Sequence, residues 1–378
     1  MILPGATVGI VGGGQLARMD ALAAIAMGYR VVVADPNPDC PAAPVSDQVV
    51  VSPLNSPEGV APLARMCDVV TYEWENIAPE VLERLAEEVP VHPKVSVLRI
   101  CQNRIFEKQA LTAAGVPVAP WRPVTTREEF EEALAAIGVP SVLKTATEGY
   151  DGKGQVVIRR LEDAEAAYQK LAGRPLVLEQ FVPFEREVSV VVARSATGEV
   201  ATFPVAENIH RNNILAVSIV PARVKPEVAD AARKLAVRIA EHLDLVGLLG
   251  VEMFALPDGT LLANELAPRP HNSGHYTMNA CVTSQFEQHI RAVCGLPLGA
   301  VDLLTPVVMV NIMGEDYPLR IDAALSDPRV KLHLYGKQEA RVGRKMGHLN
   351  VTAPTVEEAL ERALRAKERI CGNPERSR

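Results

Sequence analysis

The stretch GVEMFALPDGTLLANEL, residues 250–266, decides the fold of the central part of this chain. Apolar residues alternate with their neighbours on both sides of Asp258–Gly259, and an Asp-Gly pair between two such runs is the strongest short-range signal for a β-hairpin. A two-residue loop at Asp258–Gly259 places Glu252 directly opposite Glu265 on one face, with Cβ atoms roughly 5 Å apart. We therefore predict a hairpin that presents two facing carboxylates.

Two carboxylates this close repel each other by about 3 kcal/mol at an effective dielectric near 20. A fold tolerates such a pair when a cation lies between the two groups, and ligands that are all oxygen favour Mg²⁺. A surface hairpin with two solvated acids explains the same spacing without a metal. The segment that follows the hairpin favours the metal site.

That segment is LAPRPHNSGHYT, residues 266–277. Pro268 and Pro270 remove backbone donors and fix the backbone, which excludes a regular helix or a central strand. Polar loops that leave the end of a strand commonly carry binding groups. Arg269 offers a planar fork suited to a carboxylate, bicarbonate or phosphate. An ordinary surface turn is the alternative, and the neighbouring acids favour a binding loop.

The composition indicates a soluble globular enzyme with two or three domains. The chain has 378 residues, of which 48% are hydrophobic and 22% charged. A net charge of −7 argues against general binding to nucleic acid or to acidic membranes. The six cysteines lie far apart without a CxxC pair, which suits a reducing cytosol. No signal peptide is apparent, and no apolar run approaches the roughly 18 residues needed to span a bilayer. We expect a cytoplasmic protein.

Strands and helices alternate from the strand TVGIV, residues 7–11, to about residue 98. This βαβ order predicts a doubly wound parallel sheet. From there to about residue 296, antiparallel strand pairs mix with helices and predict an α+β unit. The remaining part is a small β-rich cap that ends in a helix at 356–371. The fold class is therefore α/β together with α+β.

The first glycine loop, GGGQLA at residues 12–17, fits G-x-G-x-x-A, and Asp35 ends the second predicted strand. This is the dinucleotide fingerprint, but many open α/β sheets use such a turn for any phosphate. A tight strand-to-helix turn that needs glycine is a further explanation. The Pro-Asn-Pro after Asp35 is an awkward continuation for an adenosine ribose site. We therefore predict that the loop binds the phosphate of another substrate.

The second glycine loop, TATEGYDGKG at residues 145–154, lies between two predicted strands. Its glycines allow the backbone to approach phosphate oxygens closely, and Lys144 and Lys153 add positive charge. The order differs from GxxxxGK[ST], so the loop is not a P-loop. Its position between strands predicts a flap over a nucleotide. A plain hairpin tip is the alternative.

Together, GGGQLARM, YEWENI, GYDGKGQ and NELAPRPHNSGH resemble the N5-carboxyaminoimidazole ribonucleotide synthetases, ATP-grasp enzymes of purine biosynthesis. The resemblance runs through nearly all of the chain, and GYDGKGQ with APRPHNSGHYT is its most specific part. It implies a preATP-grasp domain at 1–98, an ATP-grasp domain at 99–296 with a flap subdomain at about 115–182, and a small C-terminal domain at 297–378.

The same resemblance implies a reaction. ATP and bicarbonate form carboxyphosphate, which carboxylates 5-aminoimidazole ribonucleotide to give N5-carboxyaminoimidazole ribonucleotide, ADP and phosphate. It also implies Mg²⁺ as a cofactor and a homodimer. Biotin carboxylase and formate-dependent glycinamide ribonucleotide transformylase share the ATP half and are the alternatives within the fold. An NAD-dependent oxidoreductase would rest on GGGQLA and Asp35, and a non-catalytic regulator would bind ATP without turnover.

Site residues follow from the resemblance position by position. Glu252 and Glu265 match the magnesium ligands, although Ala267 stands where the wider superfamily often has an Asn, and Asn264 precedes the second acid instead. Glu187 is expected to accept the ribose hydroxyls, since Val188 and its alternate neighbours face the other way. The residues expected to contact ATP are Arg104, Lys144, Gly149, Tyr150, Asp151, Gly152, Lys153, Gly154, Gln155, Glu179, Gln180, Phe181, Val182, Glu187, His210, Asn264 and Glu265.

The second substrate is expected at the junction of the three parts. Residues that resemble those around the ribonucleotide and bicarbonate, and that we expect to be catalytic, are Tyr150, Asp151, Lys153, Arg269 and His271. Further ribonucleotide contacts are expected from Gly14, Gln15, Leu16, Glu73, Lys337, Arg344 and Lys345. A solvated face is the alternative for the basic run in the cap. One departure lies in the flap, where Ala146-Thr147-Glu148 replaces the more basic or glycine residues expected.

Overall fold

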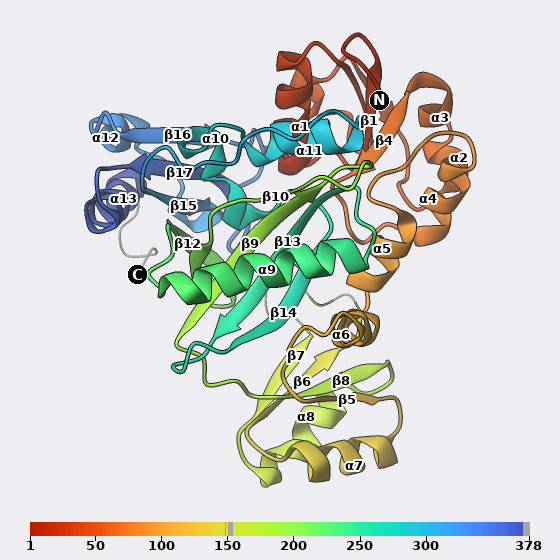
Figure 1. Ribbon diagram of the computed structural model, residues 1–378, viewed down its shortest axis with the longest axis vertical. Helices are drawn as coiled ribbons and strands as arrows, with labels where there is room; N and C mark the ends of the chain where they lie inside the picture. Colours follow the sequence, from red (N-terminus) through yellow and green to blue (C-terminus); the bar gives the residue numbers. More distant parts are fainter. Residues whose placement is uncertain (148, 150–153, 373–378) are drawn as a thin grey trace.

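The computed structural model describes residues 1–147, 149 and 154–372, whose strands form three sheets (Figure 1). The first sheet lies at one end of the molecule, the second crosses its centre, and the third forms a separate lobe. No helix among the described residues combines the length and the apolar character that a membrane crossing needs.

The first sheet is parallel, as predicted, with strand order β3-β2-β1-β4. Its buried strands are short apolar runs, and β1 is buried over its whole length. That pattern is typical of a parallel sheet covered on both faces. The strands are β1 (Thr7–Val11), β2 (Arg30–Asp35), β3 (Gln48–Val51) and β4 (Val69–Tyr72), and the helices are α1 (Gln15–Ala26), α2 (Pro57–Val60), α3 (Pro62–Met66), α4 (Pro79–Ala86) and α5 (Val95–Cys101).

The central sheet is antiparallel and has the order β14-β13-β9-β11-β12-β15-β17-β16, with β10 paired to β9. Its strands are β9 (Arg186–Arg194), β10 (Val200–Thr202), β11 (Ala206–Arg211), β12 (Ile214–Val220), β13 (Gly247–Ala255), β14 (Leu261–Ala267), β15 (Val307–Met313), β16 (Val330–Leu334) and β17 (Lys345–Thr352). The helices that accompany it are α9 (Pro226–His242), α10 (Thr277–Ala280), α11 (Gln285–Val293), α12 (Ile321–Leu325) and α13 (Val356–Ile370).

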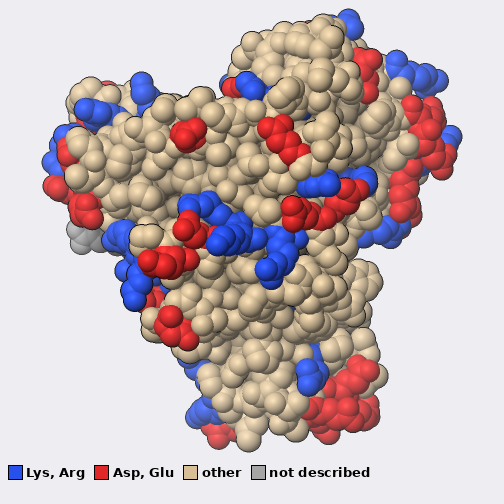
Figure 2. Space-filling view, viewed as in Figure 1, with Lys and Arg blue, Asp and Glu red and all other residues tan. Residues whose placement is uncertain are grey.

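Helix α9 covers one face of the central sheet (Figure 1). Its alanines, including Ala232 and Ala236, are buried against the valines of β9 and allow close approach of helix and sheet. Its outer face carries exposed Lys234, Arg238 and Glu241, and Figure 2 shows charged side chains gathered across this part of the molecule. The helix is thus amphipathic in the ordinary sense.

The C-terminal strands continue the central sheet. β15 pairs with β12 through Val217 and Val310, and β17 and β16 follow in order. Val217, Val310 and helix α13 share one hydrophobic core. The β-rich cap predicted from residue 297 onward therefore has no sheet of its own.

The third sheet forms the lower lobe in Figure 1 and has the antiparallel order β5-β8-β6-β7. The predicted capping box at Thr126 and Glu129 is present at the start of α7, and Phe130 is buried in the core of the lobe. The elements are β5 (Trp121–Val124), β6 (Ser141–Thr145), β7 (Gln155–Ile158), β8 (Leu176–Gln180), α7 (Arg127–Ile137) and α8 (Ala164–Leu171); α6 (Arg104–Ala113) connects the lobe to the rest.

Candidate active site

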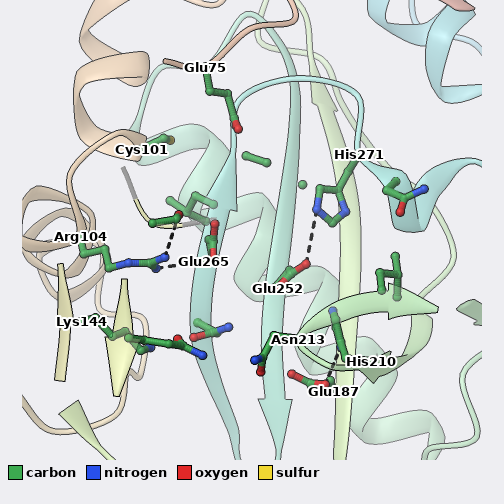
Figure 3. Close-up of a pocket in the computed structure, with 18 of the residues that line it drawn as sticks. Glu75, Cys101, Arg104, Lys144, Glu187, His210, Asn213, Glu252, Glu265 and His271 are labelled. Atoms are coloured by element: carbon green, nitrogen blue, oxygen red, sulfur yellow. Dashed lines mark hydrogen bonds and ion pairs between the residues drawn. The ribbon is translucent and has the colours of Figure 1, made fainter. Parts of the chain in front are cut away.

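A cleft of about 860 Å³ lies where the three sheets meet (Figure 3). Leu16 and Glu73 line it from the first sheet, Glu179 from the third, and the paired strands β13 and β14 from the central sheet. Every part of the chain thus contributes to one cavity, which is large enough for a nucleotide and a second small substrate.

The acidic hairpin has the predicted pairing but a different turn. Glu252 pairs with Glu265, as expected. The loop, however, contains three residues, because Leu256 N–H donates to the Thr260 carbonyl at 2.9 Å. Gly259 at φ +88° supplies the left-handed residue that such a three-residue hairpin loop requires. The prediction of a two-residue turn at Asp258–Gly259 is therefore wrong.

A bulge in β14 restores the predicted register. Near the loop, Met253 pairs with Ala263, but the next pair along the ladder is Glu252 with Glu265. Asn264 is consequently the extra residue, without a partner on β13. Bulges of this kind re-aim side chains and are frequent beside active sites. Both Asn264 and Glu265 line the cleft.

The two carboxylates contact different basic side chains. Glu265 Oε2 lies 3.5 Å from Arg104 Nη1, and Glu252 Oε1 lies 3.4 Å from His271 Nε2. Figure 3 shows these contacts on opposite sides of the strand pair. Burial and the charge of Glu265 raise the pKa of Glu252 to about 7. A positive charge near this pair would favour both carboxylates and oppose that shift.

The acid pair fits a hard divalent cation. Within the described ranges, no group of three or more His, Cys, Asp and Glu side chains could hold a metal ion. Glu252 and Glu265 are oxygen donors, however, and the buried side-chain oxygen of Asn264 has no hydrogen-bond partner among the described residues. Mg²⁺ commonly takes only one or two protein carboxylates and completes its shell with water and substrate phosphates. Ala267, at the position where the wider superfamily often has an Asn, offers no side-chain ligand.

Lys144 is held by a buried carboxylate of the third sheet. Its Nζ lies 3.1 Å from Glu179 Oε2, and Lys108 Nζ lies 3.5 Å from the same oxygen. Burial disfavours the charged form of Glu179, but the two lysines outweigh it and lower the pKa of this carboxyl to about 2. Glu179 therefore orients Lys144, and its own side chain is 3% exposed.

Glu187 and His210 form a pair on neighbouring strands of the central sheet. His210 Nδ1 lies 2.7 Å from Glu187 Oε2, and both side chains line the cleft (Figure 3). Burial disfavours the imidazolium, but the hydrogen bond and charge of Glu187 outweigh burial and raise the pKa of His210. The pair offers an oriented acceptor for a hydroxyl group.

Arg269 is half-buried beside a glutamate that follows the first sheet. Its Nη2 donates to Glu75 Oε2 at 2.7 Å, and its Nη1 donates to the Pro270 carbonyl. Glu75 follows β4, so this ion pair joins the polar loop of the central sheet to the first sheet. The remaining guanidinium donors are available to an anion in the cleft.

His271 is a neutral imidazole that faces Glu252. Burial, followed by the charge of Arg269, lowers the pKa of His271 to about 3. Ser273 N–H donates to His271 Nδ1 at 3.4 Å, which leaves the proton on Nε2, the atom nearest Glu252. A Cβ on Gly250 would lie 2.8 Å from the His271 ring, so the ring position requires glycine there.

The first glycine loop is occupied by carboxylates of the chain itself. Glu73 accepts the N–H groups of Gly14 at 2.7 Å and Leu16 at 3.1 Å, and Asp35 accepts that of Gly13 at 2.8 Å. These amides at the start of α1 are the donors that a phosphate would use. Glu73 and Asp35 accept these amides in this structure, and the predicted contact between the loop and a substrate phosphate stays a prediction.

The basic residues of the cap lie at the edge of the cleft. Lys345 lines the cavity, and Lys337 Nζ donates to the Lys345 carbonyl at 2.8 Å. Arg344 Nη1 donates to the Glu339 carbonyl. Burial and the charge of Arg344 lower the pKa of Lys337 to about 8, whereas nearby Glu73 opposes this shift.

Most predicted site residues meet in this one cavity. Those that line it are Gln15, Leu16, Glu73, Arg104, Lys144, Gly149, Gln155, Glu179, Gln180, Phe181, Val182, Glu187, His210, Glu252, Asn264, Glu265, Arg269, His271 and Lys345. The predicted contacts that do not line it are Gly14, Gly154, Lys337 and Arg344. The predicted roles of Tyr150, Asp151, Gly152 and Lys153 lie outside the described residues.

Several cleft residues were not predicted. Glu75 stands in the quoted motif YEWENI, two positions after Glu73, and that spacing on an extended segment is the signal that could have found it. Phe184 and Phe254 stack with ring centroids 4.7 Å apart and line the cleft. Asn213 reaches the cavity from the turn between β11 and β12 (Figure 3). No sequence pattern marked these three as neighbours of the acid pair.

Comparisons with known proteins agree with this arrangement. Residues 5–102 match the ribonucleotide synthetase preATP-grasp domain, residues 109–286 the ATP-grasp domain, and residues 307–362 the phosphoribosylaminoimidazole carboxylase C-terminal domain. The chain is 50% identical to N5-carboxyaminoimidazole ribonucleotide synthase from Bacillus subtilis over 349 residues, 92% of either chain.

Solved structures are similar over almost the whole length. An N5-carboxyaminoimidazole synthetase from Staphylococcus aureus complexed with ADP has a TM-score of 0.92 at 38% identity and covers 97% of this chain and 98% of its own. The Aspergillus clavatus enzyme in complex with ADP and the aminoimidazole ribonucleotide has a TM-score of 0.88 at 34% identity, with 97% and 99% covered.

Proposed function

The chain belongs to the N5-carboxyaminoimidazole ribonucleotide synthase family, and we infer from this membership how its cleft performs the family's reaction. The protein is an ATP-grasp ligase that carboxylates 5-aminoimidazole ribonucleotide in an ATP-dependent reaction of purine biosynthesis. The observation that carries the mechanism is the convergence of the Glu252–Glu265 pair, Lys144 and Arg269 on one cleft.

In the first step, a bicarbonate oxygen attacks the γ-phosphorus of ATP, the bond to ADP breaks, and carboxyphosphate forms. Bicarbonate is otherwise a poor electrophile, because hydroxide is a poor leaving group. Catalysis of phosphoryl transfer consists mainly of positioning and charge neutralisation. We assign the positioning of the ATP phosphates to Lys144, which Glu179 orients, and to Arg104. Mg²⁺, when bound by Glu252 and Glu265, would neutralise the phosphate charge.

In the second step, the exocyclic amine of the ribonucleotide attacks the carboxyl carbon, either of carboxyphosphate or of CO₂ released from it. Phosphate leaves and takes up the amine proton, so no strong protein base is needed. We assign Arg269 to the anionic carboxyl group. His271 Nε2 faces Glu252 at 3.4 Å and Ser273 engages its Nδ1, so we assign His271 to orienting Glu252.

The arrangement of the cleft also suggests which residues bind the ATP ribose and which bind the ribonucleotide. Glu187, oriented by His210, is expected to accept the ribose hydroxyls. Lys345, which lines the cleft, and Lys337, which donates to the Lys345 carbonyl, are expected to hold the ribonucleotide phosphate on the side of the cleft where Leu16 lies. Closure of the predicted flap would exclude water from carboxyphosphate.

The decisive experiment is an ADP-release assay in which bicarbonate and 5-aminoimidazole ribonucleotide are each omitted in turn. We expect full turnover only with both. Turnover that depends on biotin or formate instead would point to one of the other ATP-grasp ligases. ATP binding without turnover under any acceptor would indicate a regulator.

We further propose a homodimer in the cytoplasm. Five cysteines, Cys40, Cys67, Cys101, Cys281 and Cys294, are free thiols, which suits a reducing compartment. The dimer rests on the family resemblance. Light scattering coupled to gel filtration tests it: a mass near twice the 40.8 kDa chain is expected, and a monomeric mass would contradict it.

A further inference from the structure

We propose that Glu107 and Lys108 of α6 hold the bulge of β14 in shape and thereby position Glu265 opposite Glu252. Both are positioning residues, since neither lines the cleft. The inference deepens the proposed function, because it rests on Glu252 and Glu265 being the metal-binding pair of that reaction.

The contacts lie on either side of Glu265. Lys108 Nζ donates to the carbonyl of Asn264, the residue before it, at 3.2 Å. Glu107 Oε2 accepts the N–H of Leu266, the residue after it, at 2.8 Å. A bulge disrupts the ladder locally and leaves its extra residue unpaired. Two side chains of one helix turn thus bond the backbone that flanks Glu265.

The burial of these side chains shows that packing alone does not explain them. Glu107 and Lys108 are each 1% exposed, whereas their neighbour Phe106 is 50% exposed. A helix that only packed against the sheet would turn its apolar residue inward and its charges outward. Burying ionisable groups is costly unless they are hydrogen-bonded or paired. In α6, the two buried ionisable groups lie where the helix contacts the bulge, and each is hydrogen-bonded to its backbone.

Glu107 separates this role from simple charge balance. Lys108 also lies 3.5 Å from Glu179, so a balancing role would explain its charge. For Glu107 no ion pair within 4 Å occurs among the residues that the structure describes, and its Oε1 has no hydrogen-bond partner there. The charges of Lys108 and Arg104 act on Glu107 from a longer distance. The contact that its buried carboxyl makes is with the Leu266 N–H, so backbone hydrogen bonds account for the positions of both side chains.

The test compares Glu107→Leu, Glu107→Gln and Leu111→Ala. Leucine fills the space of Glu107 without an acceptor, whereas the amide oxygen of glutamine still accepts the Leu266 N–H. Leu111 is buried on the same helix and makes no contact of this kind, so its truncation controls for lost stability. The dissociation constant of ADP is measured by titration in EDTA and in Mg²⁺, alongside Tm and the Mg²⁺ dependence of ADP release.

In the wild type, Mg²⁺ is expected to strengthen ADP binding. Glu107→Leu is expected to lose 10- to 100-fold of that enhancement, the range typical for residues that orient metal ligands, and to need correspondingly more Mg²⁺ for half-maximal ADP release. Glu107→Gln is expected to stay within about threefold of the wild type, because the hydrogen bond remains. Leu111→Ala should lower Tm and leave the enhancement in place.

Several outcomes would overturn the inference. If Glu107→Leu and Leu111→Ala behave alike, α6 contributes only stability, and the proposed function is untouched. If Glu107→Gln is as impaired as Glu107→Leu, charge rather than the hydrogen bond matters. If Mg²⁺ has no effect on ADP binding by the wild type, the metal role of the acid pair fails first. Should Glu107→Leu not fold, Lys108→Met tests the other contact and is expected to show the same loss, whereas a full Mg²⁺ enhancement in that variant would reject the proposal.

Discussion

Glu252 and Glu265 carry the electrostatic cost of the site. Burial and the facing charge raise the pKa of Glu252 to about 7, so the charged form of this carboxylate is disfavoured in the metal-free site. A divalent cation held by both oxygens would remove that cost and use the same charge for binding. The acid pair therefore destabilises the metal-free protein locally, and the same two charges become favourable when a divalent cation binds.

Glu265→Gln is therefore expected to lower ATP turnover by a factor on the order of 1,000, while the ribonucleotide still binds. The amide is isosteric but lacks the charge that holds the metal. ADP release and equilibrium binding of the ribonucleotide measure the two effects. Asp258→Asn makes the same change at the exposed tip of the same hairpin and should leave turnover unchanged. Full activity in the Glu265 variant would refute the metal assignment.

Lys337 gives the reaction a pH dependence. Burial, followed by Arg344, lowers its pKa to about 8, so its positive charge is lost as the pH rises through that value. If Lys337 holds the ribonucleotide phosphate, kcat/KM for the ribonucleotide should fall above about pH 8, because this parameter reports the free enzyme.

Lys337→Arg provides the matched control for this pH dependence. Arginine stays protonated throughout the accessible range, so the alkaline fall of kcat/KM is expected to move to higher pH or to disappear. Steady-state kinetics between pH 6.5 and 9.5 test this. The same alkaline limb in wild type and variant would show that another group titrates.

At the scale of the elements, the hairpin shows what local pattern can and cannot predict. Alternation and Asp-Gly correctly predicted two paired strands and the Glu252–Glu265 register. The three-residue loop and the bulge at Asn264 were not predicted, and their effects on register cancel. The sequence around Asn264 has no pattern that predicts a bulge. The side chains that bond the bulged backbone belong to α6, which lies over 150 residues earlier in the chain.

The segment RIFEKQALTAAG is typical of a helix, and α6 is present, but its sequence does not show which side chains it buries. Hydrophobicity favours burial of Phe106, whereas tertiary contacts bury Glu107 and Lys108 instead. Glu179 was predicted to contact ATP. Its strand lines the cleft, but its side chain turns to two lysines. Side-chain partners across elements depend on packing that periodicity does not encode.

The pair of lysines makes Glu179 a sensitive position of the third sheet. Glu179→Gln leaves two buried ammonium groups without a carboxylate and is expected to lower the free energy of unfolding by about 3–5 kcal/mol. KM for ATP should also rise, since Lys144 loses its orientation. Denaturant unfolding and steady-state kinetics measure the two effects. Glu165→Gln, on the exposed face of α8, should change stability by less than about 0.5 kcal/mol.

The acid dependence of stability checks the same assignment. The folded-state pKa of Glu179 is about 2, below its usual 4.5. The stabilisation is therefore complete above about pH 4.5 and is lost as the pH falls towards 2. In Glu179→Gln, the decrease in stability across this window should be smaller. An identical decrease in wild type and variant would contradict the buried pair.

At the scale of the whole molecule, the site exists only because distant segments converge. Glu75 and Arg269 are 194 positions apart and form one ion pair. The βαβ alternation predicted the first sheet, and the family resemblance placed the motifs around one cleft. Neither indicated that β15, β17 and β16 would continue the central sheet, since pairing between β12 and β15 spans almost 90 residues.

That continuity predicts that the cap cannot be removed. Ending the chain at Leu304 would expose the edge of β12 and the buried side chains of Val217 and Ile219, which pack in the core shared with α13. Exposed apolar edges aggregate, so we expect an insoluble or misfolded fragment by gel filtration and circular dichroism. Lys345→Gln removes only the lysine that the cap contributes to the cleft, and this variant should remain folded while binding the ribonucleotide less tightly. A monomeric fragment that still binds ATP would show instead that the central sheet is stable without its C-terminal strands.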